Sequence, residues 1–387
     1  MPSKTLYLLT LSTLVAGAFA EFTGTFKYTY PPIQAIPPVD SAQVKQWLSE
    51  IDMTKVPKVP VVKCNGQTPD SSSDSACDWS NTGCTTGDIT VCPKGEWGLT
   101  YDDGPTQYSP TLYDFLAKSN QKATLFYIGS QVHDYWKNAL MGCGAGHQVS
   151  LEIGVHTWSH NPSTCLTNEQ FVAEIKWTET IINEVCGVIP KYFRPPYGDV
   201  DDRIRGLLTQ MGYKNVIWDL VSHVSGCILD TNDWDLPPGG KLTVDKVDAS
   251  FAGWIANAPK DTTGHICLEH ELYNSTVSEA IKWLPKLQSA FTVKTVADCL
   301  GDANPYRSGS PNVTVSASAS ISSASASASA STTPSAPSSI PAAAASGSTG
   351  NTTSTPTSTP ASLASKSGVA SGVVVAVVAV LVAALVL

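Results

Sequence analysis

The 387-residue sequence has no cluster of basic residues. Its 24 Lys and Arg are outnumbered by 33 Asp and Glu, so the formal net charge is −9 and the pI is about 5.2. A protein that neutralises nucleic-acid phosphates needs clustered positive charge, so this composition argues against nucleic acid as a partner. An uncharged or weakly cationic partner fits better. The sequence also contains neither an internal repeat nor a glycine-rich phosphate loop.

No C-x-x-C pair occurs, although the sequence holds ten cysteines. In an oxidising compartment an even number of cysteines indicates disulfides rather than a metal cluster. Cys64, Cys77, Cys84 and Cys92 lie close enough in the sequence to predict local disulfides within the N-terminal segment. The complete pairing stays open at this stage, because spacing alone does not determine it.

The N-terminus has the pattern of a secretory signal peptide. Lys4 is followed by the apolar run LYLLTLSTLVAGAFA, which ends in small residues at Ala20. This order of a basic, an apolar and a small-residue region predicts a signal over residues 1–20, with cleavage after Ala20. The remaining chain is then expected in an oxidising, extracellular environment.

The C-terminal part lacks large apolar side chains until its last residues. Ser, Thr, Ala and Pro dominate residues 308–371, a composition typical of an O-glycosylated stalk, which we place at 304–371. The final run, residues 372–387, is uncharged and shorter than the roughly 20 residues of a spanning helix. We expect it to be a GPI signal that is removed, with attachment within residues 358–367 and the protein held at the plasma membrane or cell wall. Sequons predict N-glycosylation at Asn274, Asn312 and Asn351.

Between residues 95 and 303, short apolar runs alternate with longer amphipathic ones, and 42% apolar residues are enough for a sizeable core. This alternation is typical of strands and helices around a parallel sheet. Strands are expected at residues 97–102, 123–129, 150–157, 192–196, 214–220, 264–270 and 291–296, and helices at 109–119, 167–187, 200–212, 247–258 and 277–290. Seven strands predict a deformed or incomplete (β/α) barrel. Residues 21–94, richer in Pro and Ser, are expected to form an extension across this domain.

Polar motifs follow the expected strands at their C-terminal ends, where function gathers in such folds. The motifs are DDGP, HTWSH, RPPYGD, DTNDW and EHE. Taken alone, Asp102 and Asp103 before Gly-Pro are typical of a solvated turn, and an H-x-x-x-H pair is usually structural. Together at strand ends, they indicate catalysis. The spacing of His156 and His160 suits a divalent metal with a carboxylate as third ligand, whereas His133, His147, His223 and His265 are interpreted as structural.

In order and spacing, TYDDGP, HTWSH, RPPYG, DTNDW and LEH resemble the five motifs of the polysaccharide deacetylases of carbohydrate esterase family 4, the NodB homology domain. With its signal, stalk and apolar tail, the chain is most similar to GPI-anchored fungal chitin deacetylases. The resemblance covers residues 95–300 and says nothing about residues 21–90. It implies a barrel of the NodB type and a hydrolase that removes acetyl groups from N-acetylglucosamine units of chitin, giving chitosan and acetate. We expect it to act as a monomer in wall remodelling.

The resemblance also implies roles for individual residues. Asp102 is the general base, and Asp103 binds one zinc or cobalt ion together with His156 and His160. Two adjacent carboxylates then divide the work of holding a metal and taking a proton from water.

The remaining roles implied by the resemblance concern the acid, the charges and the substrate. His270 is the general acid, held by Asp233, and Arg194 keeps Asp102 ionised by pairing with it. The backbone N–H of Tyr197 stabilises the oxyanion. Trp234 and Leu268 line the pocket for the acetyl methyl, although Leu268 is equally interpretable as an ordinary core residue.

Several alternatives stay open on the sequence alone. The polymer is chitin or another one, such as partly deacetylated glucosamine chains, peptidoglycan or acetyl xylan. A wall-anchored glycoprotein that only binds polysaccharide predicts eroded catalytic positions, which are intact here. The ligand set suits zinc, cobalt or manganese-like ions. Residues 221–229 stand between the expected strand at 214–220 and the DTNDW motif, whereas in many relatives that strand runs almost directly into the motif. They are either a surface loop held by Cys227 or a gene-model error.

Overall fold

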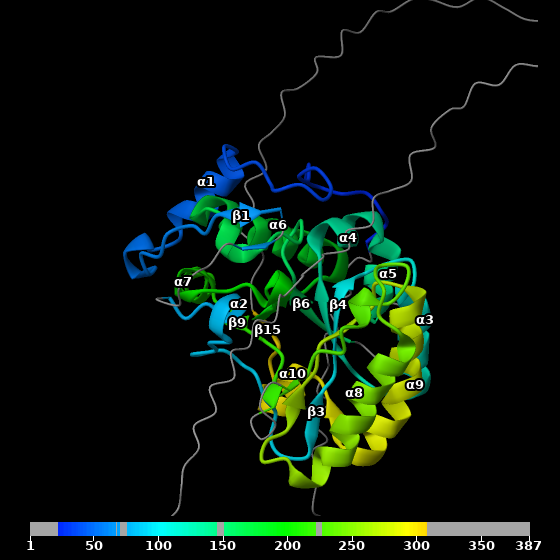
Figure 1. Cartoon of the computed structure of the whole chain (residues 1–387). Helices are drawn as coiled ribbons and strands as arrows, with labels where there is room; N and C mark the ends of the chain where they lie inside the picture. The colour runs from blue at the N-terminus through cyan, green and yellow to red at the C-terminus, as the bar shows by residue number, and fades with distance from the viewer. Residues whose placement is uncertain (1–21, 67, 70–75, 145–150, 222–226, 308–387) are drawn as a thin grey trace, which may run out of the picture. The chain divides into compact units, whose positions relative to one another are not determined.

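The computed structural model describes residues 22–66, 68–69, 76–144, 151–221 and 227–307 (Figure 1). The expected signal peptide, the expected tail and all but residues 304–307 of the expected stalk therefore lie outside the described residues. Within the described ranges, no helix combines the length and the apolar character that crossing a membrane requires.

A parallel sheet of six strands carries the motifs singled out above. Its order is β13-β4-β5-β6-β8-β9, and neighbouring strands run parallel throughout. The strands are β13 (Glu269–His270), β4 (Thr100–Gly104), β5 (Thr124–Tyr127), β6 (Glu152–Val155), β8 (Tyr192–Phe193) and β9 (Lys214–Asn215). β4, β5 and β6 are buried along their whole length, as expected for parallel strands covered on both faces.

A second parallel sheet continues the first below it in Figure 1, in the order β12-β3-β14. It comprises β12 (His265–Ile266), β3 (Glu96–Gly98) and β14 (Thr292–Lys294). The expected strands at 97–102 and 264–270 are thus each divided into two short ones.

The edge strands of the six-stranded sheet are β13 and β9. The segments next to them are joined by isolated hydrogen bonds rather than by a ladder. The Asp219 N–H donates to the Ile266 carbonyl at 3.0 Å, and the Leu268 N–H donates to the Leu229 carbonyl at 2.9 Å. Asp230 and Leu268 also form an isolated parallel bridge. Among the described residues the ladders close no complete ring, and the expected deformed (β/α) barrel is confirmed.

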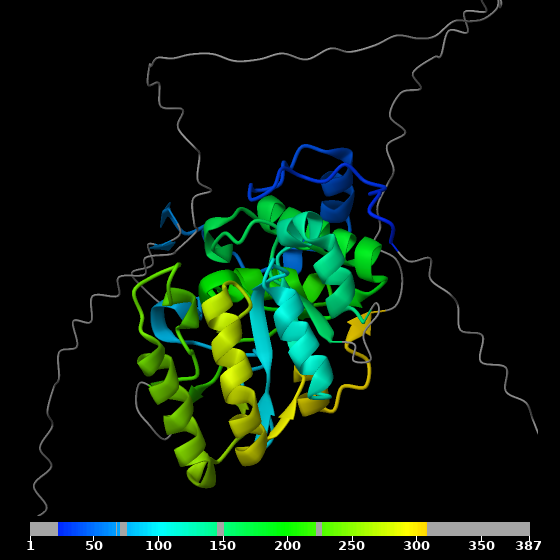
Figure 2. The ribbon, with the colours of Figure 1, turned by 90° about the vertical axis from the view of Figure 1, so that its right-hand side faces the viewer.

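The five expected helices correspond to α3 (Ser109–Lys118), α6 (Asn168–Cys186), α7 (Asp202–Gln210), α8 (Val244–Asn257) and α9 (Asn274–Ala290). α6 begins at the predicted capping box of Thr167 and Gln170 and ends at Gly187, whose φ is 71°. Figure 2 shows α8, α9 and α3 side by side against one face of the strands. Shorter helices are α1 (Ala42–Ser49), α2 (Trp79–Thr82), α4 (Gly129–Asp134), α5 (Trp136–Gly142) and α10 (Val296–Leu300).

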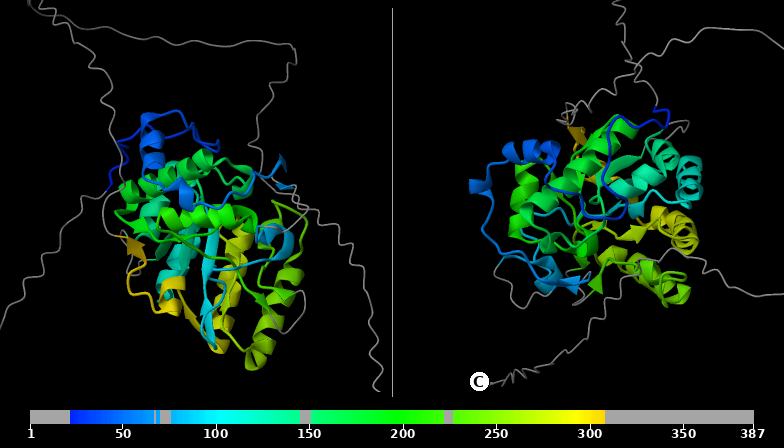
Figure 3. Two further views of the ribbon diagram at one scale, coloured as in Figure 1. Left: turned by 90° about the vertical axis from the view of Figure 1, so that its left-hand side faces the viewer. Right: turned by 90° about the horizontal axis from the view of Figure 1, so that it is seen from above.

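The N-terminal extension lies across the outer surface of the domain, where α1 packs against α6 (Figure 3). Val44 and Trp47 of α1 are buried in the main apolar core. The prediction of local disulfides in this segment is correct for Cys77–Cys84 and wrong for its two other cysteines. Cys64 pairs with Cys165 and Cys92 with Cys299, so these bonds tie the extension to the domain.

A further disulfide joins Cys143 to Cys186, and the buried Cys267 forms no disulfide with a cysteine whose side chain the structure describes. At the C-terminal side, β15 (Tyr306–Arg307) pairs antiparallel with β7 (Ile189–Pro190). The described fold therefore extends four residues past position 303, the expected end of the catalytic domain.

Candidate active site

Asp102 and Asp103 end β4 at a bulge. The register of β4 against β5 shifts between Asp102 and Gly104, and Asp103 has a φ of 69°. In a regular strand adjacent side chains point to opposite faces, whereas a bulge re-aims one of them. Oδ2 of Asp102 and Oδ1 of Asp103 accordingly lie 3.9 and 3.4 Å from the same atom, Nε2 of His156. The bulge is the reason that both carboxylates face one site.

Asp103, His156 and His160 form a compact group of possible ligands. Oδ1 of Asp103 lies 3.4 Å from Nε2 of His156 and 3.1 Å from Nε2 of His160. The three ligand atoms all lie within 4.8 Å of one another. Asp103 and His156 are buried and His160 is partly buried. The arrangement places two imidazole nitrogens and one carboxylate oxygen around one point.

The hydrogen bonds of the two histidines leave their Nε2 atoms directed at Asp103. Nδ1 of His156 donates to the carbonyl oxygen of Arg194 at 2.7 Å, so in the neutral ring Nε2 carries the lone pair. Nδ1 of His160 lies 3.0 Å from the hydroxyl of Tyr197. Oδ1 of Asp103 is buried and makes no well-directed hydrogen bond to any described group. Such an oxygen beside the Nε2 atoms of two imidazoles fits a divalent cation of the zinc or cobalt type.

The charge state of Asp103 agrees with a ligand role. Burial opposes its ionisation, but the nearby His160 and His156 outweigh this effect and hold the pKa of Asp103 well below its usual range. The carboxylate is therefore ionised at neutral pH.

The loop that carries both histidines is held by a helix behind it. Thr157 and His160 have φ values of 64° and 57°, which non-glycine residues adopt at an energetic cost. Glu174 of α6 accepts hydrogen bonds from the N–H of Trp158 at 2.7 Å and of Ser159 at 2.8 Å, and from the Ser159 hydroxyl at 2.5 Å. Burial raises the pKa of Glu174 to about 7, against the effect of these donors. Sequence reasoning missed Glu174, because a Glu within an amphipathic helix carries no signal of such a role.

Asp102 is paired with a fully buried arginine. Nη1 of Arg194 donates to Oδ1 of Asp102 at 2.9 Å and to Oγ1 of Thr100 at 2.7 Å. The guanidinium also lies over the ring of Phe126, 4.4 Å from its centroid. The expected contact between Asp102 and Arg194 is present in the structure.

His270 and Asp233 form a second buried charge pair, and His270 is the strand partner of Asp102 in the pairing of β13 with β4. Nδ1 of His270 donates to Oδ1 of Asp233 at 2.6 Å, and the backbone N–H of His270 donates to Oδ2 at 3.0 Å. Burial lowers the pKa of His270, but the charge and hydrogen bond of Asp233 outweigh it and raise that pKa to about 10. His270 is therefore protonated at neutral pH, the state that a proton donor needs.

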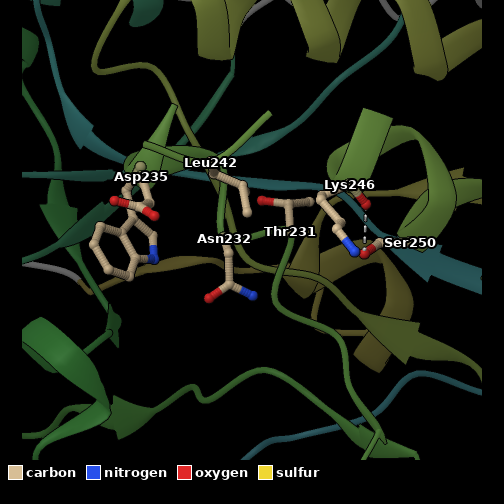
Figure 4. A pocket seen from close by; sticks show the side chains of 7 residues that line it. Thr231, Asn232, Asp235, Leu242, Lys246 and Ser250 are labelled. Atoms are coloured by element: carbon tan, nitrogen blue, oxygen red, sulfur yellow. Dashed lines mark hydrogen bonds between the residues drawn. The ribbon is translucent and has the colours of Figure 1, made fainter. Parts of the chain in front are cut away.

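A pocket of about 400 Å³ is lined in part by the residues that flank Asp233 in the sequence (Figure 4). Its lining comes from two segments, one around Asp233 and one that includes the start of α8; the residues are Thr231, Asn232, Trp234, Asp235, Leu242, Lys246 and Ser250. Trp234, an expected substrate residue, is among them and is partly exposed. Leu268, the other, does not line this pocket and belongs to the main apolar core. Tyr197 is placed beside His160, with a φ of 61°.

The other predicted positions lie away from the cluster or outside the described residues. Asn274 is exposed at the first turn of α9, whereas Asn312 and Asn351 lie outside the described residues, as do His147 and His223. His133 stacks on Phe26, and His265 is hydrogen-bonded between Asp219 and Asp261.

The inserted segment at residues 221–229 is described only in part. β10 (Leu220–Val221) and β11 (Cys227–Ile228) pair antiparallel, so the two ends of the segment lie side by side. Residues 222–226 between them are outside the described residues.

The fold and the cluster together define a class: deformed α/β barrels whose strand ends carry an Asp-His-His set between an arginine-paired carboxylate and a carboxylate-paired histidine. The sequence profile of the polysaccharide deacetylases matches residues 91–216. Chitin deacetylase 1 of Cryptococcus neoformans var. grubii is 40% identical over 306 residues, which are 75% of this chain and 64% of that protein. The matched part of the chain thus spans less than two thirds of this relative's length.

Chitin deacetylase 1 of Saccharomyces cerevisiae is 33% identical over 259 residues, which are 66% of this chain and 77% of that protein. Among solved structures, the chitin deacetylase of Colletotrichum lindemuthianum is 27% identical, with a TM-score of 0.48, and the match covers 57% of this chain and 94% of that one. At 33% identity over 77% of the yeast protein, this match is extensive enough to show the family. This chain belongs to the polysaccharide deacetylases.

Proposed function

We propose that this protein is a metal-dependent chitin deacetylase, which hydrolyses the N-acetyl groups of N-acetylglucosamine units to give chitosan and acetate. One observation carries the proposal: the ligand atoms of Asp103, His156 and His160 converge within 4.8 Å, next to Asp102, which is paired with Arg194, and Asp102 is the strand partner of His270, which is paired with Asp233. Hydrolysis of an amide needs a base for the attacking water and an acid for the leaving amine, and each pair supplies one of these groups.

The three ligands would hold a zinc or cobalt ion. When bound, such an ion supplies Lewis-acid polarisation of the amide carbonyl and makes water easier to deprotonate. Imidazole nitrogens and an ionised carboxylate are donors that both ions accept.

The protein's own groups then carry out the proton transfers. Asp102 accepts a proton from the attacking water, and the hydrogen bond from Nη1 of Arg194 holds the Asp102 carboxylate in place for that step. As the carbon–nitrogen bond breaks, His270 donates its proton to the amine nitrogen, and Asp233 stabilises His270 in its protonated form beforehand. The backbone N–H of Tyr197 is the proposed donor to the carbonyl oxygen, which becomes negative as water adds.

The pocket beside Asp233 offers room for a sugar unit next to the reacting one. It presents the indole of Trp234 and the side chain of Leu242, together with polar groups of Asn232, Lys246 and Ser250. An aromatic face with polar groups around it suits a pyranose ring, which has apolar C–H faces and hydroxyls at its edge. Leu268, which belongs to the main apolar core, is proposed to contact the acetyl methyl.

Mass spectrometry of N-acetylglucosamine oligomers incubated with the purified protein, with and without a chelator, tests this function. A loss of 42 mass units per acetyl group, abolished by the chelator and restored by zinc or cobalt, is expected from the replacement of acetyl by hydrogen. Intact oligomers at every metal concentration would exclude the function. Parallel incubations with peptidoglycan fragments and acetyl xylan decide between chitin and the other polymers.

The cell-surface location is proposed from composition. A signal peptide at residues 1–20, a Ser/Thr-rich stalk and an uncharged tail at residues 372–387 support a secreted protein held at the plasma membrane or wall by a GPI anchor. Treatment of cells with a phosphatidylinositol-specific phospholipase should release it. Retention of the protein together with a peptide from residues 373–387 would exclude the anchor.

A further inference from the structure

The first described segment of the chain, residues 22–32, buries alternate aromatic side chains. Phe22, Phe26, Tyr28 and Tyr30 are partly buried, and the residues between them, apart from Gly24, are exposed. This period of two is that of an extended segment with one face against the protein. The face lies on α4, α5 and α6: Phe22 meets Trp136 edge to face, and Phe26 stacks on His133 with ring centroids 4.6 Å apart.

Hydrogen bonds fix the register of this segment on α6. The backbone N–H of Lys27 and the hydroxyl of Tyr30 donate to the two carboxylate oxygens of Glu184, at 2.5 and 2.6 Å. Gly24 adopts a φ of +92°, and a Cβ on it would come within 2.6 Å of the Trp136 ring. These contacts therefore hold the segment in one defined position on the surface of the domain.

The same segment covers a residue of the metal-ligand loop. The ring of Tyr30 stacks on that of Trp158, with centroids 5.7 Å apart and planes 8° from parallel. Nε1 of Trp158 donates to the carbonyl oxygen of Pro32 at 3.0 Å. Trp158 lies between His156 and His160 in the sequence and is fully buried. One face of the Trp158 ring and its only polar side-chain atom, Nε1, therefore both make contacts with residues 22–32.

The loop needs support from more than one side because Thr157 and His160 have positive φ values. Glu174 holds its backbone from α6, and the N–H groups of Gly129 and Ser130 donate to the carbonyls of Thr157 and Trp158. Strained backbone persists where its surroundings over-determine it. Residues 22–32 supply the contacts on the side that these groups leave open.

We propose that residues 22–32 are a brace that holds the loop of His156 and His160 in its metal-binding geometry, with Tyr30 as the principal positioning residue. The inference rests on the metal site of the proposed function. A brace of this kind acts on the affinity for the metal, because ligands that are already in place lose less freedom when the ion binds. Tyr30 touches neither the ligands nor the reacting atoms, so its effect passes through Trp158.

The test is a titration of metal-free full-length protein with Co²⁺, followed by visible absorption. Tyr30→Ala should weaken Co²⁺ binding about 10-fold, the lower end of what groups behind metal ligands contribute. Tyr30→Phe keeps the stacked ring and loses only the bond to Glu184, so it should restore the affinity. Phe22→Ala is the matched control: it removes an aromatic side chain from the same segment, and within the described part of the chain the ring contacts of Phe22 are with Phe26 and Trp136, not with Tyr30 or Trp158.

Each outcome bears on the proposal. A folded Tyr30→Ala protein that binds Co²⁺ as tightly as the unaltered protein overturns the brace, and so does equal weakening by Phe22→Ala. If Tyr30→Ala does not fold, as judged by near-ultraviolet circular dichroism, Trp158→Phe decides, because it removes only the bond to Pro32 and the indole edge. Weaker Co²⁺ binding in that variant supports the brace, and unchanged binding overturns it. Failure of the unaltered protein to bind Co²⁺ would instead refute the metal site itself.

Discussion

Asp233 accepts two hydrogen bonds from a single residue, His270: one from the backbone N–H and one from Nδ1 of the ring. The backbone bond fixes the position of the carboxylate, and the ring bond stabilises the protonated imidazole. A buried histidine without such a partner would be neutral, because burial disfavours its charge. The pair is therefore the physical reason that a proton is held at this point of the site at neutral pH.

The first prediction is an alkaline limit of activity that depends on Asp233. Because the pKa of His270 is raised to about 10, His270 is protonated below that pH and loses its proton as the pH rises through it. The value of kcat/KM should then fall on the alkaline side near pH 10. Asp233→Asn removes the charge that raises this pKa, so the fall should move to lower pH, towards the ordinary histidine value of about 6.5.

The pH profile of kcat/KM on a soluble oligomer, with the metal concentration held saturating, measures this shift. Asp235→Asn is a suitable control, since Asp235 is two residues away and makes no hydrogen bond to His270 within the described structure. An alkaline limb at the same pH in Asp233→Asn and in the unaltered protein would show that His270 is not the acid.

The second prediction concerns the metal ligands. His156→Ala or His160→Ala should abolish both metal binding and turnover, because the two remaining ligands hold a catalytic ion poorly. Metal content of the purified variants by elemental analysis checks this, with His133→Ala as a control histidine outside the cluster. Full metal occupancy and normal activity in either variant would show that the ligands are wrongly assigned.

The third prediction concerns Glu174, which holds the ligand loop from α6. In Glu174→Gln the amide oxygen still accepts from the N–H groups of Trp158 and Ser159, and the NH₂ faces the Ser159 hydroxyl. The negative charge that strengthens these bonds is lost, so the free energy of unfolding should fall by about 1 kcal/mol. Metal affinity should weaken by roughly 10- to 100-fold. Chemical denaturation and Co²⁺ titration measure the two effects. Glu169→Gln, an exposed position in the first turn of the same helix, should change neither.

The fold was largely predictable because its strands and helices have distinct sequence periods. The α6 boundaries follow from Thr167, Gln170 and Gly187, and the buried strands read as continuous apolar runs. The breaks within two of the expected strands were not predictable, because apolar runs carry no signal for where a ladder changes partners. Long-range disulfides were not predictable from the sequence for a similar reason. Cys92 and Cys299 are 207 residues apart, and only the folded chain brings them together.

For the site, the motifs identified which residues gather at the strand ends, but not how they are aimed. Side chains alternate in a strand, so Asp102 and Asp103 share one site only because of the bulge at Asp103. No sequence pattern predicts that bulge. Glu174 and Tyr30 act on the ligand loop from distant segments, and neither lies in a motif. Their roles follow from packing between elements, which local patterns do not encode.

The last prediction separates the two adjacent carboxylates. Asp103 lies 3.1 and 3.4 Å from the two histidine Nε2 atoms, whereas Asp102 is bound to Arg194. Asp103→Asn should therefore weaken metal affinity together with activity, and Asp102→Asn should retain the metal and lose the chemistry. An amide keeps the shape of the carboxylate, but it neither accepts the proton of water nor brings a full negative charge to the ion.

Loss of a general base costs about 10²- to 10⁴-fold in rate, so kcat of Asp102→Asn should fall by at least that range while KM changes little. Excess zinc or cobalt should partly restore Asp103→Asn, because mass action compensates for a weaker site, and should leave Asp102→Asn inactive. Metal content and kcat measured on both variants over a range of metal concentrations decide the matter. Equal metal loss in the two variants, or rescue of both, would refute the division of roles, because a ligand and a base respond differently to added metal.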